Sequence, residues 1–302
     1  MLTRPTSARS WRKTAQIWLA ALRPRQWTKN GLVFGGLVFS LNLDKPELVA
    51  RVLLAFLVLC VLASSGYLVN DTLDAPQDRL HPAKARRPIA AGLIAPRHAI
   101  LVASGLFLLA LPIAAWLGGG FLLLGLGYVG LTAAYSLWLK HYALLDVFVI
   151  AVGFVLRAAA GAVVIGVMIS PWLLLCTLLG ALLIALGKRR SELASLEATA
   201  PSHRSSLAAL TVEFLDELML IMAAASIMAY SLYTFSERPG HPPLLMLTIP
   251  LVIYGIFRYL YLVRIAGLGG SPEEVLLGDP PLLGTVVLWG LLSLGILYLA
   301  PR

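Results

Sequence analysis

The segment NDTLDAPQD, residues 70–78, gathers three carboxylates in an otherwise apolar stretch of sequence. Asp71, Asp74 and Asp78 are spaced i, i+3 and i+7, which would place them on one face if a helix continued through them. We expect Pro76 to break or kink such a helix, so the spacing is only suggestive. Three carboxylates this close repel one another unless a cation lies among them. Mg²⁺ suits this position, because it is typically held by one or two carboxylates plus substrate phosphates.

The loop that follows these acids supplies cations, namely Arg79, Lys84, Arg86 and Arg87. Carboxylates for a metal, followed by cations for phosphate groups, form the set expected for a Mg²⁺–diphosphate substrate. The alternative is a solvated loop with internal salt bridges, but the order of acids first and bases second favours the substrate site. Asn70 either caps the helix end or joins the metal ligands. His81 is expected to have a structural or supporting role, since the carboxylates suit Mg²⁺ better.

The composition indicates a membrane protein. The chain has 302 residues, of which 59% are hydrophobic and 13% are charged, whereas soluble domains carry about 25% charged residues. Repeated apolar runs near 20 residues long predict an all-α, polytopic membrane protein. The two cysteines, Cys60 and Cys176, lie inside apolar runs and are interpreted as buried small hydrophobic residues.

Nine transmembrane helices are predicted. Residues 1–21 form a basic N-terminal arm, and residues 22–302 form a single transmembrane domain with no room for a soluble domain between spans. The predicted spans cover residues 31–44, 48–70, 97–117, 120–139, 143–165, 171–187, 212–234, 243–263 and 281–300.

Lysine and arginine set the expected orientation, because cytoplasmic loops retain them. Nineteen of the 24 basic residues fall on the side that carries the N-terminus and the loop after the second span. The N-terminus and the polar loops are therefore expected in the cytoplasm, in a plasma (inner) membrane. Topology and attraction to anionic lipid explain much of the net charge of +9. Nucleic-acid binding is not expected, since no aromatic-basic module is present.

Ionisable residues inside spans are candidates for function. Asp146 and Arg157 lie in the fifth span, eleven residues or about 16 Å apart along a helix, so each must find another partner or a water-filled cavity. Residues 22–30, LRPRQWTKN, suit either interfacial anchoring or the substrate, and Gln26 and Asn30 favour the substrate because anchoring does not need them. Further candidates lie near the cytoplasmic ends of spans, namely Arg23, Lys29, Tyr135, Lys140, Lys188, Arg189 and Glu192.

The segment NDTLDAPQD matches the NDxxDxxxD signature of the UbiA superfamily of intramembrane prenyltransferases. Nine spans also match that fold, a helical bundle with a polar cavity facing the cytoplasm. From about residue 22 to 280, the chain more closely resembles the branch that transfers phosphoribose to a polyprenyl phosphate for cell-wall arabinan precursors. That likeness rests on RPRQWTKN, DRLHPAKARRPIAAG, YSLWLKH, LDVFVIAVGFVLRAAAGA, GKRRSEL and GGSPEEVLLGD.

The resemblance implies that Asn70, Asp71, Asp74 and Asp78 hold Mg²⁺ on the diphosphate of 5-phosphoribosyl 1-diphosphate. Aromatic prenyltransferases of the superfamily carry a second Asp-rich motif after the sixth span. This chain has GKRRSEL there, with cations in place of most acids. The change disfavours an uncharged aromatic acceptor and suits a site that holds an additional phosphate.

Roles are assigned to the remaining candidates on the same basis. Asp71, Asp74, Asp78, Lys29 and Glu192 are predicted as catalytic residues. The donor phosphates are assigned to Arg79, Lys84, Arg86 and Arg87, and the acceptor phosphate or the 5-phosphate to Lys29, Lys140, Lys188 and Arg189. Asp146 and Glu192 are candidates for the ribose hydroxyls or a second metal, and the other expected substrate contacts are Arg23, Gln26, Asn30, Tyr135 and Arg157. The expected partners are the donor, a polyprenyl phosphate and the bilayer, and a homo-oligomer is compatible with the sequence.

Two alternatives remain at this point. An aromatic prenyltransferase that uses a prenyl diphosphate would need the same acidic motif and metal. A transporter would line its path with Asp146 and Arg157, but transporters often contain repeated halves, and neither a repeat nor an even span count is found. The cationic loop after the sixth span argues against the aromatic prenyltransferase.

Overall fold

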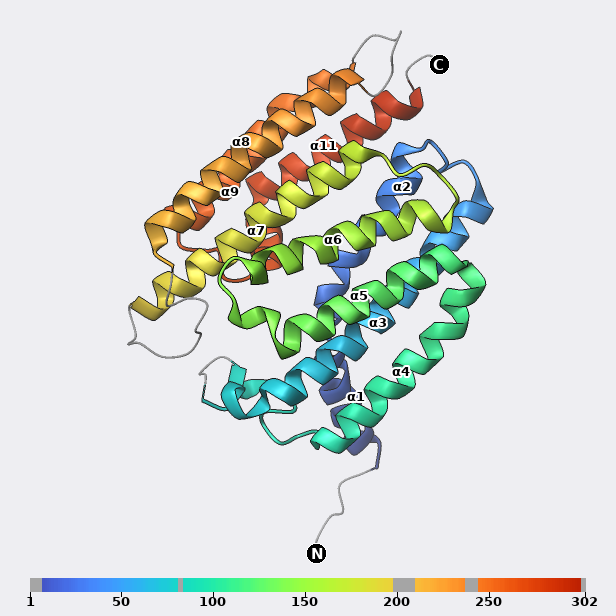
Figure 1. The fold of residues 1–302 in the computed structure, drawn as a ribbon, viewed down its shortest axis with the longest axis vertical. Helices are drawn as coiled ribbons and strands as arrows, with labels where there is room; N and C mark the ends of the chain where they lie inside the picture. The colour runs from blue at the N-terminus through green and yellow to red at the C-terminus, as the bar shows by residue number, and fades with distance from the viewer. Residues whose placement is uncertain (1–6, 81–83, 198–209, 237–243, 300–302) are drawn as a thin grey trace, which may run out of the picture.

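The computed structural model describes residues 7–80, 84–197, 210–236 and 244–299, and these residues form a helical bundle without a strand (Figure 1). Eight helical segments in this part of the chain are long and apolar enough to cross a membrane. They are α3 (Pro46–Asp78), α4 (Pro96–Leu117), α5 (Gly119–Leu137), α6 (Leu145–Val164), α7 (Pro171–Glu197), α8 (Val212–Ser236), α9 (Ile249–Arg264) with the 3₁₀ helix η4 (Leu244–Thr248) before it, and α11 (Pro280–Leu299).

The first predicted span, residues 31–44, differs from expectation. The structure has a 3₁₀ helix, η1 (Pro24–Val33), followed by the six-residue helix α2 (Phe34–Phe39). The segment nevertheless runs from Arg23, at the end where α3 finishes, to the end where α3 begins, so it crosses the bundle as a 3₁₀ and α segment and not as one long α-helix. It continues from α1 (Ser7–Leu22), a helix within the basic arm, and packs along the bundle.

Proline stands at the start of many of these helices. A backbone N–H in the first turn has no partner within the helix, so proline, which lacks this group, costs nothing there. This applies to α3, α4, α7, α9, α11 and the short helix α10 (Pro272–Gly278), through Pro46, Pro96, Pro171, Pro250, Pro280 and Pro272. Pro76 behaves differently, and the expected break in α3 is wrong. The helix continues through Pro76 to Asp78, with Arg79 N–H still donating to the Ala75 carbonyl at 3.2 Å. The acidic motif therefore lies on regular helix.

Glycine allows η1 and α2 to approach α6 closely. A Cβ on Gly161 would lie 1.8 Å from the Val33 carbonyl oxygen, and a Cβ on Gly36 would lie 2.8 Å from the backbone of Ala162. Contacts this short leave no room for any side chain. The 3₁₀ segment is therefore held against α6 by direct backbone contact.

Helix α6 joins two apolar cores. One core packs α2, α3, α4 and α5 against α6, and the other packs α7, α8 and α9 against it. Large apolar side chains are also exposed on the outside of the bundle, such as Leu101, Leu108, Trp116 and Leu291. Exposed apolar side chains over eight long apolar helices fit a protein that spans a lipid bilayer several times.

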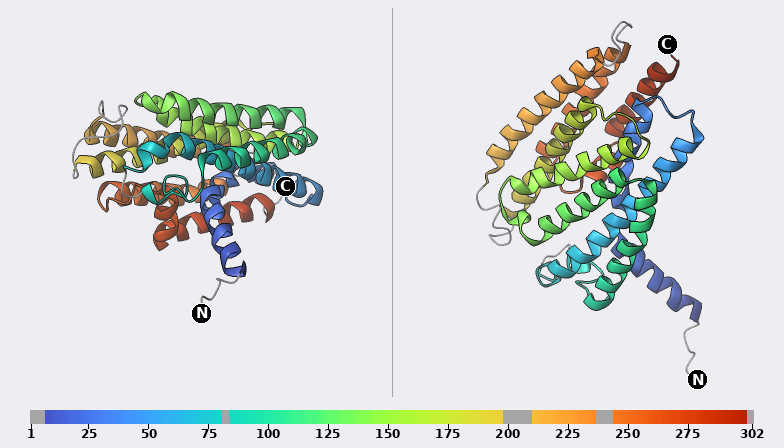
Figure 2. Two further views of the ribbon diagram at one scale, coloured as in Figure 1. Left: turned by 90° about the horizontal axis from the view of Figure 1, so that it is seen from below. Right: turned by 45° about the vertical axis from the view of Figure 1, so that its right-hand side comes forward.

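The helices finish at two ends that differ in chemistry. We call the polar end the one where α3, α5, α7 and α9 finish, at the bottom of Figure 1. Helix α1 packs Trp18 and Ala21 near this end, and its N-terminal part projects beyond the bundle (Figure 2). At the opposite end, Arg51 donates to the last carbonyls of α4 and α6, at Leu117 (2.7 Å) and Val164 (3.1 Å). Such a cation stabilises helix C-termini.

Candidate active site at the polar end

The acidic motif forms the last turns of α3, and helical geometry divides it into two parts. Seven residues span about 700° of helix, so Asp71 and Asp78 are only about 20° apart around the axis, while Asp74 lies about 60° to one side. Asp71 and Asp78 are buried, with 3% and 4% of their surface exposed. The sequence suggests that the three carboxylates share one cation. In the structure, Asp71 and Asp78 instead form a pair, and Asp74 stands apart from them.

Arg87 joins the pair. Its Nη1 donates to Asp78 Oδ2 at 2.5 Å and to Asp71 Oδ1 at 3.2 Å. Arg23 Nη2 reaches Asp71 from the other side, at 2.6 and 2.8 Å from the two carboxylate oxygens. The Arg87 Nη1 atom thus lies between two buried carboxylates, and Arg23 is a second cation that pairs with Asp71.

Asp74 has a cation of its own. Lys140 Nζ, from the 3₁₀ helix η3 (Leu139–His141), donates to Asp74 Oδ1 at 2.5 Å. Asn70 Nδ2 donates to Asp74 Oδ2 at 3.0 Å, one helical turn away. The remaining amide oxygen, Asn70 Oδ1, is buried and accepts no hydrogen bond. A buried, unpartnered oxygen beside a carboxylate is a group that a hard cation could use.

The loop after α3 is held in place by apolar anchors. Ile89 and Ile94 are buried against α3 and α4, and Arg79 Nε donates to the Ala90 carbonyl at 3.1 Å. The short 3₁₀ helix η2 (Lys84–Arg86) leads into Arg87, whose N–H donates to the Lys84 carbonyl at 2.9 Å. Arg86 itself is exposed. These contacts fold the loop back so that Arg87 meets the acids of its own helix.

Arg23 is positioned by a turn of unusual backbone geometry. It has φ 54° and ψ 59°, in the left-handed region, at the joint between α1 and η1. Non-glycine residues adopt this conformation at a cost and are found most often at functional sites. Ser64 of α3 braces the same joint, because its hydroxyl donates to the Leu22 carbonyl at 2.9 Å and accepts from Trp27 Nε1 at 3.0 Å. The Trp27 indole N–H is therefore bonded to α3 within the bundle.

A second charged cluster lies across the same end of the bundle. Arg189, 2% exposed on α7, has its Nε 2.6 Å from Asp146 Oδ2, its Nη1 paired with Glu192, and its Nη2 3.1 Å from the Tyr135 hydroxyl. The contact to Asp146 is an ion pair without hydrogen-bond alignment, so neither Asp146 oxygen accepts a hydrogen bond. This carboxylate is buried, charged and incompletely satisfied.

The connection from α5 to α6 links the two clusters. Tyr135 on α5 contacts Arg189, Lys140 on η3 contacts Asp74, and Asp146 in the first turn of α6 contacts Arg189. The acidic motif and the GKRRSEL segment are therefore two sides of one polar region.

Arg157 belongs to a third, interior cluster. It is 6% exposed and donates to Asn30 Oδ1 (2.7 Å), the Gly153 carbonyl (2.9 Å) and the Tyr128 hydroxyl (2.8 Å). Asn30 Nδ2 in turn lies 3.2 Å from Cys60 Sγ. Asp146 and Arg157 thus find separate partners, as their spacing along one helix predicts. Arg157 and Asn30 face each other between η1, α3, α5 and α6.

Several predicted residues lie around these clusters. Gln26 and Lys29 are partly buried on η1, next to Arg23, and Lys188 precedes Arg189 on α7. His81 lies outside the described residues.

Two residues with charged partners in this part of the bundle were not among the predicted site residues. Tyr128 partners Arg157, and Asp216 binds both Arg190 and Arg264, each at 3.1 Å. A search for hydroxyls that could face the buried arginine would have suggested Tyr128.

The residues of the acidic motif fit a divalent ion that takes part of its ligands from a bound phosphate. Within the described part of the chain, no three His, Cys, Asp or Glu side chains converge as a metal-binding group. Two neighbouring carboxylates, Asp71 and Asp78, are nevertheless held on one Arg87 nitrogen. Mg²⁺ typically takes only one or two carboxylates and completes its shell with water and substrate phosphates. The site therefore suits a metal that arrives with a phosphate ligand, not one enclosed by protein.

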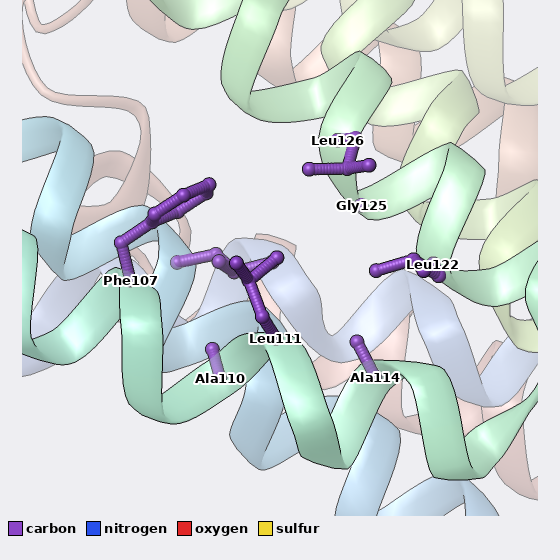
Figure 3. Close-up of a pocket in the computed structure, with 8 residues that line it drawn as sticks. Phe107, Ala110, Leu111, Ala114, Leu122, Gly125 and Leu126 are labelled. Carbon is purple, nitrogen blue, oxygen red and sulfur yellow. The ribbon is translucent and has the colours of Figure 1, made fainter.

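An apolar crevice lies elsewhere, between α3, α4 and α5. Figure 3 shows Phe107, Leu111 and Ala114 of α4 facing Leu122 and Leu126 of α5. Every residue that lines it is apolar, so it cannot hold phosphate groups. The two charged clusters that join the acidic motif and Arg189 to their partners lie at the polar end, away from this crevice.

Residues 32–269 match the model of the UbiA prenyltransferase family. The chain belongs to the UbiA prenyltransferase family. A UbiA homologue from Archaeoglobus fulgidus, solved with GPP and Mg²⁺ bound, shares the fold with a TM-score of 0.69 and 21% identity, over 93% of this chain and 99% of that one. The acidic motif of this UbiA protein thus lies in a bundle of the fold expected from the sequence.

Curated relatives are closer in sequence. A protein from Mycolicibacterium smegmatis named decaprenyl-phosphate phosphoribosyltransferase is 35% identical over 273 residues, covering 86% of each chain. A protein of the same name from Corynebacterium glutamicum is 34% identical over 293 residues, covering 94% of this UbiA chain and 87% of the relative.

Proposed function

We propose that this protein transfers a 5-phosphoribosyl group from 5-phosphoribosyl 1-diphosphate to a polyprenyl phosphate and releases diphosphate. The observation that carries the proposal is the polar region itself, where the α5–α6 connection contacts both the acidic motif of α3, through Lys140, and Arg189 of α7, through Asp146. Relatives named decaprenyl-phosphate phosphoribosyltransferase, similar over most of the chain, support the same reaction. A donor with a diphosphate and a 5-phosphate, and an acceptor with another phosphate, would use both sides.

Asp71 and Asp78 are the proposed metal ligands, with Asn70 and Asp74 beside them. A bound Mg²⁺ would neutralise charge that develops on the departing diphosphate. The A. fulgidus homologue was solved with GPP and Mg²⁺ bound, which supports the proposal that this protein also uses a divalent ion. Around the carboxylates, Arg23, Arg87 and Lys140 are placed to donate to diphosphate oxygens. Charge-assisted hydrogen bonds from arginine to phosphate are among the stronger polar contacts in proteins.

The second cluster is the proposed site for the rest of the donor. Arg189 is fixed by Glu192, Asp146 and Tyr135, so its guanidinium is already oriented before a phosphate arrives. The unsatisfied oxygens of Asp146 could accept hydrogen bonds from ribose hydroxyls. Lys29 and Lys188 are the proposed contacts of the acceptor phosphate. Arg157 and Asn30, predicted as substrate contacts, are instead proposed to hold η1 in place.

The reaction needs positioning more than acid–base chemistry. An oxygen of the polyprenyl phosphate attacks C1 of the ribose, and the bond from C1 to the diphosphate oxygen breaks as C1 gains oxocarbenium character. The acceptor is largely ionised near neutral pH, since the second pKa of a phosphate monoester is about 6. No proton has to be removed from the nucleophile. The protein therefore contributes orientation and fixed charge.

The polar end is proposed to face the cytoplasm, in a plasma membrane. Lysine and arginine are concentrated at this end, as the positive-inside rule requires. A soluble sugar phosphate would then reach the site from water, while the polyprenyl tail stays in the bilayer.

A competition between donors tests the proposal. Purified protein in nanodiscs receives Mg²⁺, a decaprenyl phosphate, and equal amounts of 5-phosphoribosyl 1-diphosphate and geranyl diphosphate, and the lipid products are identified by mass. We expect only phosphoribosylated lipid, with one diphosphate released per product. A prenylated product, with the sugar donor left intact, would overturn the proposal.

A further inference from the structure

The charges of the acidic motif are balanced by the protein itself. Three carboxylates, Asp71, Asp74 and Asp78, meet three cations, Arg23, Arg87 and Lys140, in ion pairs of 2.5 to 3.2 Å. Asp71 and Asp78 keep only 4% and 6% of their side-chain surface exposed. A dication added to this region alone would leave two uncompensated positive charges in a largely desolvated place, which is costly.

The Arg87 Nη1 atom competes with a metal most directly. It lies between Asp78 Oδ2 (2.5 Å) and Asp71 Oδ1 (3.2 Å), and thereby engages one oxygen from each of the two carboxylates best placed to share a metal. A metal that took these oxygens would have to displace the guanidinium. The Arg87 side chain is 25% exposed, so it has room to move, but the displaced cation would need a new anionic partner.

A diphosphate supplies that partner. We propose that Arg87 on Asp71 and Asp78, together with Lys140 on Asp74, prevents the carboxylates from binding a metal alone. Metal and diphosphate would therefore bind together. The cations then exchange their carboxylates for diphosphate oxygens. This inference extends the proposed function, because it assigns to Arg87 and Lys140 a positioning role that couples metal binding to donor binding.

The coupling has a signature that a purely structural role would not produce. Removing Arg87 should strengthen the binding of a metal alone, since the competitor is gone. The same change should weaken the binding of diphosphate in the presence of metal, since a phosphate contact is gone. An arginine that merely held the loop together would weaken both.

Mn²⁺ and inorganic pyrophosphate are suitable probes. Free Mn²⁺ is measured by electron paramagnetic resonance over protein in nanodiscs of uncharged lipid, and bound radiolabelled pyrophosphate is measured at saturating Mn²⁺. The variants are Arg87→Gln and, as a matched control, Arg97→Gln, which removes the same charge from an exposed position in the first turn of α4, at the polar end. Lys140→Gln repeats the test on Asp74, in case Arg87→Gln does not fold.

We expect Arg87→Gln to bind Mn²⁺ alone about fivefold tighter or more than the native protein, a coupling at the low end for linked sites. It should retain pyrophosphate about tenfold less well, as for a lost charged phosphate contact. Arg97→Gln should change each by less than about twofold, because exposed charges are largely screened. If Arg87→Gln and Lys140→Gln bind Mn²⁺ no tighter than Arg97→Gln, the inference is wrong. The assays contain neither sugar donor nor polyprenyl phosphate, so an error in the assigned donor would not change their result.

Discussion

The polar end and the interior of this bundle each hold charged residues, but the partners and the exposure of these residues differ. At the polar end, every carboxylate of the acidic motif has a cation, and the Arg23 and Arg87 side chains remain about one quarter exposed. In the interior, Arg157 is almost fully enclosed and bonds to neutral groups on Asn30, Gly153 and Tyr128. Charges that can exchange partners suit substrate binding, whereas an enclosed cation with fixed neutral partners suits positioning.

The largest effect should come from Asp71→Asn. The change keeps the shape of the side chain but removes the charge that would hold a metal, so transfer should fall by about 10³-fold, as for loss of a key electrostatic group. The melting temperature should change little, because Arg23 is partly exposed and can be solvated. Asp216→Asn is the matched control. It releases Arg190 and Arg264 between α7, α8 and α9, and should lower thermal stability while transfer persists.

Two adjacent arginines sharpen the contrast within a single turn of helix. Arg189 points to the polar region, while Arg190 donates to Asp216 and to the Val263 carbonyl between α8 and α9. Arg189→Gln should reduce kcat/KM for the sugar donor by about 100-fold. Arg190→Gln should reduce the melting temperature and leave kcat/KM within about threefold. Equal losses of kcat/KM in both variants would contradict the division of roles.

The interior cluster should respond mainly through stability. Arg157→Met leaves the Asn30 oxygen and the Tyr128 hydroxyl without their partner, at about 1–3 kcal/mol for each buried unsatisfied group. We expect a melting temperature several degrees lower and a loss of transfer of about tenfold, because η1 carries Arg23. Tyr128→Phe removes only one hydroxyl and should have a clearly smaller effect. If Arg157→Met kept its melting temperature but lost all transfer, Arg157 would contact substrate directly.

The smallest effect is expected from Asp279→Asn. Asp279 forms an ion pair with Arg258 at the polar end, apart from the site. Asp279 accepts from Arg258 and caps α11 through the Leu282 N–H, and Arg258 holds the pKa of this carboxyl below its ordinary value of 3.8. Because its pKa is lower in the folded state, the carboxylate stabilises the fold above about pH 4 and loses this effect as pH falls through the folded pKa. Asp279→Asn should therefore melt slightly lower at pH 7, with the difference vanishing as pH falls below the folded-state pKa of Asp279.

The sequence predicts much of this architecture, because long apolar runs are decisive in a membrane protein. Eight of the nine predicted spans correspond to the observed helical segments, most of them within a few residues at each boundary. The ninth, residues 31–44, is observed as the end of η1 and the short helix α2 and not as one long α-helix, and its glycines let it pack closely on α6. Pro76 is expected to break or kink the helix, yet α3 continues through it to Asp78, because the loss of one hydrogen bond near a helix end is tolerated.

The charged residues that gather at the polar end can be listed from the sequence, but their pairings cannot. The spacing of Asp71, Asp74 and Asp78 places them on one side of a helix, yet which cation meets each acid depends on segments far away in the sequence. Lys140 lies 66 residues from its partner Asp74, and Arg23 lies 48 residues from Asp71. Such contacts depend on how η1 and the α5–α6 connection pack, which local sequence patterns do not encode.

The most direct test compares native protein with Asp71→Asn in the same nanodiscs, with Mg²⁺, 5-phosphoribosyl 1-diphosphate and decaprenyl phosphate, and follows the lipid product by mass. The account predicts a phosphoribosylated lipid from the native protein, none when Mg²⁺ is chelated, and almost none from Asp71→Asn at an unchanged melting temperature. Product formed at the native rate by Asp71→Asn, or by the native protein without any divalent ion, would contradict it.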